Sequence, residues 1–186
     1  MTIFNEHGMI TSASLWLPLG ILFIGLVVMD WRHQRISFTR LLFEGLLCVY
    51  LWVLFDMTLF PINISRSTAT LIASGETFQG AIATHPLALW YNWQQPSSLY
   101  QIIGNGLMLA PLVLLVGALS VRIRQLRRSL TLAFATSLFI ECTQLLMNYF
   151  NLGDRTFDVN DLILNTCGGL IGWLFLQLGL LIWRRI

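Results

Sequence analysis

The sequence predicts an all-α integral membrane protein that crosses a bilayer five times and forms a single domain over residues 1–186. Hydrophobic residues make up 56% of the chain and charged residues 11%, whereas a soluble domain carries about 25% charged residues. The mean hydropathy is +0.71, and five stretches reach the roughly 20 apolar residues that a helix needs to cross the hydrocarbon layer. The net charge of +2 is too small to indicate a nucleic-acid partner, so none is expected.

The five predicted spans are the long apolar runs of the chain, separated by polar or basic segments. They cover residues 9–29, 41–60, 102–121, 129–147 and 162–183. Pro18 and Pro111 fall inside the first and third spans. Because a proline removes a helical hydrogen bond, we expect a kink at each of them.

The longest connection joins the second and third spans over residues 61–101. It contains Trp90, Tyr91, Trp93 and Tyr100 among serine, threonine and glycine residues. Because Trp and Tyr favour the headgroup layer of a bilayer, we expect part of this loop to lie on the outer leaflet as an amphipathic segment.

The arginine positions predict how the bundle is oriented. Basic residues close to span ends are retained on the cytoplasmic side, and all eleven basic residues of this chain are arginines. If the five spans alternate in direction, nine of the eleven fall on one side: Arg32, Arg35, Arg40, Arg122, Arg124, Arg127, Arg128, Arg184 and Arg185. We therefore predict that the N-terminus lies outside and the C-terminus inside. The 61–101 loop and the loop that carries Arg155 then face outward.

The fifth span begins with a polar stripe. Polar and small residues recur there at steps of three and four, which places them along one helix face: Asp158, Asp161, Asn165, Gly168, Gly169 and Gly172. In the fourth span, Glu141 and Gln144 are three residues apart and also share a face. We expect the glycines to form a close-packing surface.

Polar side chains on four helices are expected at similar depths below the outer surface. At the helical rise of 1.5 Å per residue, Glu141 lies about 10 Å below the outer end of the fourth span near Asn148, and Asn165 lies about 10 Å below Asp158. Asn105 and Asp56 each lie about 6 Å below the outer end of their span. Because charged groups in a membrane usually turn inward and are paired, these positions predict one polar pocket that faces outward.

Arg155 is the basic residue next to this cluster, and Asp158, one turn later, is its expected ion-pair partner. For Glu141, Asp158 and Asp161, a catalytic role and a structural ion-pair network with Arg155 both stay open. Like charges in a poorly solvated site also favour a shared proton or cation. Asp158 and Asp161 are therefore candidate ligands for a divalent cation.

The other candidate site residues are expected to bind a ligand: Arg155, Asn165, Gln144, Asn105 and Asp56. For the three amide side chains the alternative is a hydrogen bond between helices. No other cofactor is expected, because the histidines share no ligand spacing and the cysteines form no C-x-x-C pair.

Two further acids, Asp30 and Glu44, lie near the cytoplasmic ends of the first two spans. Arg32, Arg35 and Arg40 are within reach of them. We expect solvated ion pairs at the membrane interface.

The residues of the predicted pocket resemble the pattern of the VanZ-like family of membrane proteins. That pattern is Glu-x-x-Gln on one helix, a short loop, and then R-x-x-D-x-x-D-x-x-x-N-x-x-G. In this chain it reads "ECTQ" from Glu141 to Gln144 and "RTFDVNDLILNTCG" from Arg155 to Gly168. The resemblance covers residues 41–183, and one departure is Ala110, where the family usually has an aromatic residue.

The resemblance implies a multi-pass protein of the bacterial cytoplasmic membrane that acts at the cell envelope. The family is named for a member linked to resistance against the glycopeptide teicoplanin. On this basis the pocket is expected to bind or modify an amphiphile, such as a lipid-linked precursor, a phospholipid headgroup or a lipoglycopeptide drug. Two alternatives stay open: a hydrolase or transferase that uses Glu141 as general acid or base, and a subunit of a lipid translocase complex. Membrane lipids are expected partners, and a homo-oligomer stays open as well.

Overall fold

The computed structural model of the protein describes residues 9–64, 82–83, 85, 94–150, 152–153 and 155–183. Within these ranges, five helical segments are long and apolar enough to cross a membrane. They are Ser12–Arg32, Phe38–Leu59, Pro96–Leu119, Leu126–Tyr149 and Val159–Ile182. The prediction of a five-span, all-α membrane protein is therefore confirmed, and most span ends lie within three residues of the predicted ones.

The first two spans form a helical hairpin. A 3-10 turn, Ser12–Leu15, leads into α1, Trp16–Arg32. Pro18 lies in the first turn of α1, where no helical partner for its nitrogen is needed, so it helps to start the helix instead of interrupting it. Helix α2 is Phe38–Leu59, and the Ser37 side chain caps it by accepting a hydrogen bond from the Arg40 backbone N–H at 3.3 Å.

The third span is broken in two. Helix α5 is Pro96–Met108 and helix α6 is Ala110–Leu119, with Leu109 as the joint. The break follows from Pro111, which lacks the N–H that would bond to the preceding turn, so the predicted kink is confirmed there. Helix α5 begins six residues before the predicted start because Pro96 is well suited to the first position of a helix. The rest of the predicted amphipathic 61–101 loop falls mostly outside the described residues.

The remaining elements among the described residues are two long helices, a 3-10 turn and four very short strands. The 3-10 turn Val121–Arg124 leads into α7, Leu126–Tyr149. The fifth span is α8, Val159–Trp183. Strands β1, Met9–Ile10, and β2, Ile62–Asn63, pair antiparallel. Strands β3, Ile82–Ala83, and β4, Phe157–Asp158, pair in parallel, so β3 lies beside the start of α8.

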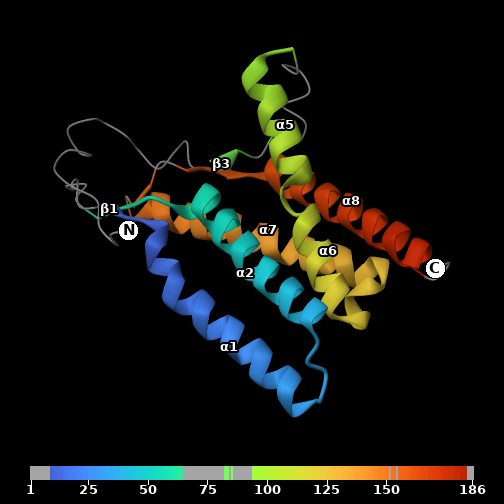
Figure 1. Ribbon diagram of the computed structural model, residues 1–186. Coiled ribbons are helices and arrows are strands. Elements are labelled where there is room, and N and C mark those ends of the chain that lie inside the picture. Colours follow the sequence, from blue (N-terminus) through green and yellow to red (C-terminus); the bar gives the residue numbers. More distant parts are fainter. Residues whose placement is uncertain are drawn as a thin grey trace, which may run out of the picture.

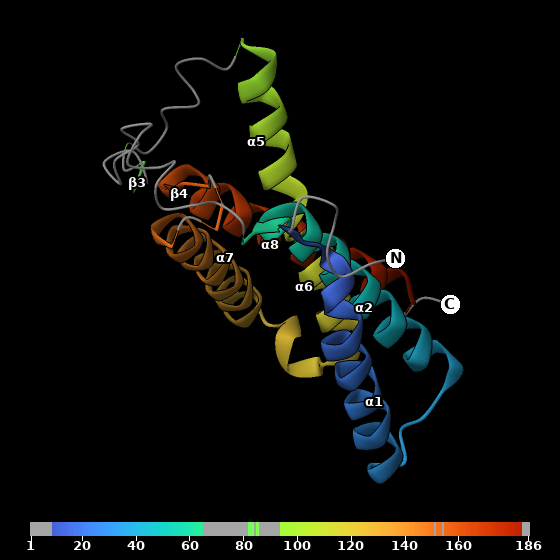
Figure 2. The same ribbon diagram turned by 90° about the vertical axis from the view of Figure 1, so that its left-hand side faces the viewer.

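Helix α8 holds the bundle together. It packs against α5, α6 and α7, while α2 packs against α6 and α7, and α1 lies at the edge against α2 (Figures 1 and 2). Helix α5 projects away from the bundle (Figure 2). The buried core lies among α2, α6 and α7 and consists of Leu47, Leu54, Leu109, Leu112, Val113, Leu115, Ala133 and Ile140.

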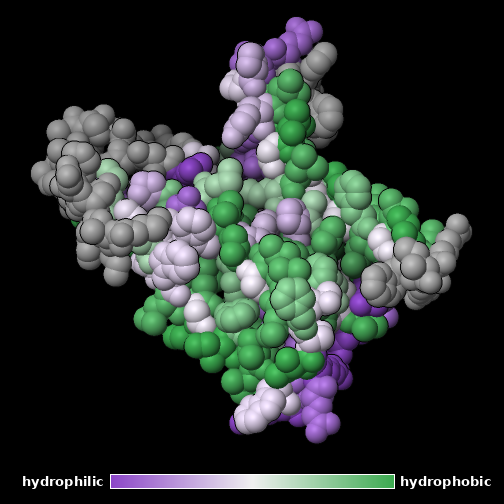
Figure 3. Space-filling view, in the orientation of Figure 1, coloured by the Kyte–Doolittle hydropathy of each residue, from purple (hydrophilic) through white to green (hydrophobic). Residues whose placement is uncertain are grey.

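The outer surface of the bundle is apolar around its middle. Figure 3 shows hydrophobic residues there and hydrophilic ones at the free tip of α5 and at the turn between α1 and α2. Large side chains such as Ile21, Val49 and Phe139 are 57% to 63% exposed, as expected for a surface in contact with lipid chains. We call the end where α2 finishes and α8 begins the carboxylate end, and the end with Arg32, Arg40 and Arg122 the arginine end.

Glycines of α8 allow close approach to the joint between α5 and α6. A Cβ atom added at Gly172 would lie 2.2 Å from the Ala110 carbonyl oxygen, and one at Gly168 would lie 2.9 Å from the Gly106 carbonyl oxygen. Both contacts are with backbone, which cannot rotate away as a side chain can. The predicted close-packing surface is confirmed.

The arginine end contains a buried ion cluster. Asp30 and Glu44 are only 2% and 1% exposed, so the expectation of solvated pairs is wrong. The Arg40 guanidinium forms an ion pair with Asp30, and its Nε lies 3.7 Å from a Glu44 carboxylate oxygen. Helices α1 and α2 pack against each other, and Arg40 contacts one acid from each of them.

Candidate functional site

A cavity of about 610 Å³ lies between α2, α5, α7 and α8. Six predicted site residues line it: Asn105, Glu141, Gln144, Arg155, Asp161 and Asn165. Much of the remaining lining is apolar and includes Val53, Leu54, Leu107, Met108 and Ile140. We call this space the polar cavity. It brings together two carboxylates, three predicted amides and a guanidinium beside hydrocarbon side chains.

The start of α8 fixes Asp158 and Glu141. The Asp158 carboxylate accepts two hydrogen bonds from Asn160, one from its backbone N–H and one from its side-chain amide, each 2.8 Å long. This is the geometry of a helix N-cap. The backbone N–H of Asp158 donates to the Glu141 carboxylate over 2.9 Å, which joins α7 to the start of α8. Asp158 itself does not line the polar cavity, and a catalytic role for it stays a prediction.

Asp161 connects α8 to α5. One of its carboxylate oxygens accepts hydrogen bonds from the side-chain amides of Gln101, at 2.9 Å, and Asn105. Asp161 also lies in the first turn of α8, where the helix dipole favours a negative charge. Two amides of α5 therefore hold one oxygen of the carboxylate, and no donor to its second oxygen is found among the described residues.

We expect the bond between Asn105 and Asp161 to contribute about 1 kcal/mol to the stability of the helix bundle. Hydrogen bonds between membrane helices contribute about 0.6 to 1.7 kcal/mol in double-mutant cycles. The test is such a cycle with Asn105→Ala, Asp161→Ala and the double variant, measured by SDS-induced unfolding in mixed micelles. A coupling energy within error of zero would show that the contact does not stabilise the fold.

Arg155 lies at the edge of the polar cavity with its side chain exposed. Its Nη2 donates to the Met57 carbonyl oxygen over 3.2 Å, in the last turn of α2. Among the described residues it forms no ion pair with Asp158, so the expected pair is wrong: the Asp158 carboxylate caps α8 instead. The Arg155 guanidinium can therefore meet an anion that enters the cavity.

The amide side chains form hydrogen bonds between helices, as the alternative reading predicted. Gln144 donates to the Thr58 carbonyl oxygen over 2.9 Å, and Asn165 donates to the Ser137 hydroxyl over 3.0 Å. Asn165 is fully buried, yet its side-chain oxygen has no donor among the described residues. A buried acceptor without a donor costs about 1–3 kcal/mol, so this oxygen indicates a position where a ligand or a water molecule donates.

The structure confirms part of the expected convergence and corrects the rest. Glu141 and Asn165 do reach the same cavity from different helices. Asp56 does not, because its side chain is exposed on another face of α2. Gln101 was missed as a site residue because the sequence placed it at the end of a loop. Its spacing of four residues from Asn105 on one helix was the available signal.

The described residues contain no group of three or more His, Cys, Asp or Glu side chains arranged to hold a metal ion. Cys142 and Cys167 are free and exposed, and neither lines the polar cavity. A divalent cation at Asp158 and Asp161 stays a prediction.

Comparison with known proteins adds one finding. A family model described as VanZ/LLP1 matches residues 46–182, a range that contains every residue of the polar cavity. A search of curated proteins and a search of solved structures each return no match.

Proposed function

Since the chain belongs to the VanZ/LLP1 family, we propose that it acts in the bacterial cytoplasmic membrane and that its polar cavity binds an amphiphile of the cell envelope. The headgroup of this amphiphile carries an anionic group and hydrogen-bond donors. A lipid-linked precursor, a phospholipid and a lipoglycopeptide such as teicoplanin all have this chemistry. Binding would contribute to envelope assembly or to glycopeptide resistance.

The observation that carries this proposal is the mixed lining of the polar cavity. Arg155 offers a guanidinium, which binds phosphate or carboxylate groups well. Glu141, Asp161 and the unpaired oxygen of Asn165 offer acceptors, which suit hydroxyl or ammonium donors. Polar groups that converge on a cavity with apolar walls beside them are typical of a ligand site.

The position of the cavity supports entry from the bilayer. Val53 and Met57 of α2 and Leu107 of α5 line the cavity and are 41%, 59% and 50% exposed. Helix α5 projects away from the bundle on this side (Figure 1). A lipid could therefore insert its headgroup between α2 and α5 without leaving the membrane.

We expect Arg155→Ala and Asp161→Asn each to weaken binding of a lipid whose headgroup carries both an anionic group and hydrogen-bond donors about tenfold, because a hydrogen bond to a charged group contributes about 1.5–3 kcal/mol. The measurement is native mass spectrometry of the purified protein titrated with phosphatidylglycerol, phosphatidylethanolamine or teicoplanin. Arg127→Ala is the matched control, because Arg127 is an exposed arginine at the arginine end. If both site variants bind all three compounds as the parent protein does, the proposal is wrong.

A hydrolase or transferase is the second candidate function. It is favoured by the presence of two carboxylates, those of Glu141 and Asp161, in one cavity, because general acid–base chemistry often uses such groups. Conversion of a bound lipid to a product of different mass, lost in Glu141→Gln, would support this function over simple binding.

A further inference from the structure

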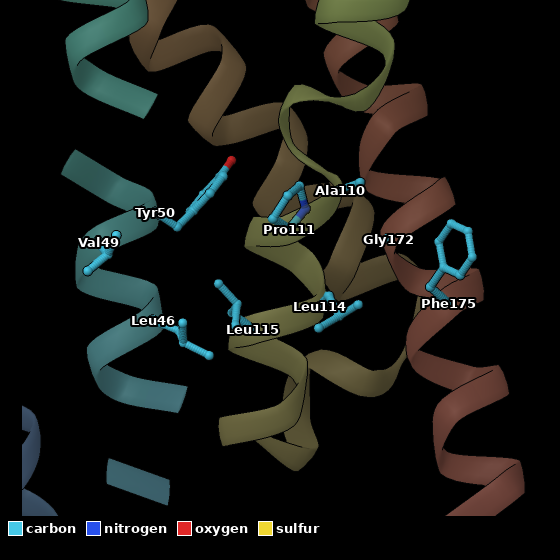
Figure 4. A pocket seen from close by; sticks show the side chains of 9 residues that line it. All are labelled: Leu46, Val49, Tyr50, Ala110, Pro111, Leu114, Leu115, Gly172 and Phe175. Carbon is cyan, nitrogen blue, oxygen red and sulfur yellow. The ribbon is translucent and has the colours of Figure 1, made fainter. Parts of the chain in front are cut away.

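An apolar groove lies next to the polar cavity, farther from the end of α2. It has a volume of about 450 Å³ and lies between α2, α6 and α8. Figure 4 shows the residues that line it, among them Leu46, Val49 and Tyr50 of α2, Pro111 of α6 and Gly172 of α8. Apart from the Tyr50 hydroxyl, these side chains are hydrocarbon. We call this space the apolar groove.

Two residues lie at the boundary between the apolar groove and the polar cavity. Tyr50 and Pro111 line both spaces. In Figure 4 the Tyr50 ring extends from α2 toward α6, and its hydroxyl donates to the Met108 carbonyl oxygen over 2.6 Å. This carbonyl lies at the joint between α5 and α6, so the break in the third span is the place where the polar lining gives way to the apolar one.

Along the helices the polar cavity is followed by the apolar groove. In a lipid the polar headgroup is likewise followed by an acyl chain. On α2, the cavity reaches from Thr58 to Tyr50, and the groove continues from Tyr50 to Leu46, a total of about 18 Å at 1.5 Å per residue. On α8, Asp161 and Asn165 line the cavity and Gly172 lines the groove. A headgroup in the cavity would therefore place its chain in the groove, pointing toward the bilayer centre.

The charged residues of the polar cavity favour some lipid headgroups over others. Arg155 is the one basic residue among the described residues that line the polar cavity, and it lies with two acids, Glu141 and Asp161. One guanidinium matches one phosphodiester, whereas a diphosphate would bring more negative charge than it can offset. The acids and the unpaired Asn165 oxygen favour a headgroup that carries a positive charge with several N–H donors, as a primary ammonium does.

We propose that the apolar groove holds one acyl chain of a phospholipid with a primary ammonium headgroup, whose phosphodiester meets Arg155 and whose ammonium meets Glu141, Asp161 and Asn165. This inference rests on the proposed function and names its ligand. Lipid chains gain little from moving between bilayer and protein, because both are apolar. The headgroup therefore supplies the affinity, and the groove fixes the position of the chain.

The test is photolabelling of the full chain in phosphatidylglycerol nanodiscs. Three probes each carry a diazirine in the hydrocarbon chain: phosphatidylethanolamine, phosphatidylglycerol and a polyprenyl diphosphate. We expect the ethanolamine probe to label peptides containing residues 46–50 and 110–115 roughly tenfold more than the other probes. In Asp161→Asn the ethanolamine probe should label these peptides no more than the other probes do.

Variants that fill the groove test the chain position. Leu46→Trp and Val49→Trp place an indole where the chain is proposed to lie, and these residues are 46% and 59% exposed, so the larger side chain need not disturb the core. Each should lower labelling of residues 110–115 several-fold. Leu178→Trp is the matched control, since Leu178 is 54% exposed on α8 and lies outside the groove.

Two results would overturn this inference. One is labelling spread evenly over the lipid-facing helices, and the other is a loss of labelling in Leu178→Trp equal to that in Leu46→Trp. If binding still depends on Arg155 in native mass spectrometry while the chain labels other helices, the proposed function stands and the groove assignment fails. Preferential labelling of the groove by the polyprenyl probe would assign the site to a lipid-linked precursor and reject the phospholipid.

Discussion

Arg40→Ala is expected to destabilise the protein by about 3–5 kcal/mol, the cost of removing one partner from a buried ion pair. Asp30 and Glu44 are almost fully buried, and Arg40 is the basic residue that contacts both. Without it, two acids lie next to each other in a membrane protein interior with no positive charge to offset them. The measurement is SDS-induced unfolding in mixed micelles, followed by circular dichroism.

Arg35→Ala is the matched control for Arg40→Ala, because Arg35 lies five residues earlier, in the connection between α1 and α2, with its side chain exposed. Its effect should stay below about 0.5 kcal/mol, as for most exposed positions. Adding Asp30→Asn to Arg40→Ala should recover part of the loss, because it removes one of the two uncompensated charges. If Arg40→Ala and Arg35→Ala unfold alike, the buried cluster does not stabilise the hairpin of α1 and α2.

The number of spans was predictable because the hydrophobic length needed to cross a bilayer is fixed by its thickness. The polar cavity was largely predictable for a similar reason. Helical rise sets the depth of each residue, so Glu141 and Asn165, on separate spans, could be placed at one level before their contacts were known. Pro111 likewise marked the joint between α5 and α6, because proline cannot donate a backbone hydrogen bond.

Rotation about the helix axis was harder to predict than depth. Asp56 has the right depth on α2, yet it lies on an exposed face, because depth alone does not fix which face of a helix turns inward. The predicted ion pair between Arg155 and Asp158 was wrong for another reason. Capping of a helix N-terminus competes for the same carboxylate, and the Asp158 side chain bonds to Asn160 instead.

The burial of Asp30 and Glu44 could not be derived from the sequence either. Both residues lie close to arginines near span ends, which is also the pattern of a solvated interfacial pair. Their burial depends on how closely α1 and α2 pack against each other at the arginine end, and that is a property of two helices together. Neighbouring charges therefore predict a pairing but not its exposure to solvent.

Gly172→Ala is expected to be the most damaging of the alanine substitutions at glycines of α8. The added Cβ would lie 2.2 Å from the Ala110 carbonyl oxygen and 2.8 Å from the Ala110 Cα. These are backbone atoms at the start of α6, so α6 and α8 must separate to accommodate the methyl group. Overpacking costs about 1–3 kcal/mol and occasionally more, and we expect at least 3 kcal/mol here, measured by the same unfolding assay.

A graded series separates this steric effect from a general effect of alanine. Gly168→Ala should cost less than Gly172→Ala, because its Cβ would lie 2.9 Å from the Gly106 carbonyl oxygen. Gly179→Ala should be neutral or stabilising by up to about 1 kcal/mol, since nothing lies within 4 Å of its added Cβ and alanine has the higher helix propensity. Equal effects at the three positions would mean that α8 does not contact the joint between α5 and α6 this closely. Gly172 and Ala110 both line the apolar groove, so Gly172→Ala should also reduce lipid labelling in the fraction that remains folded.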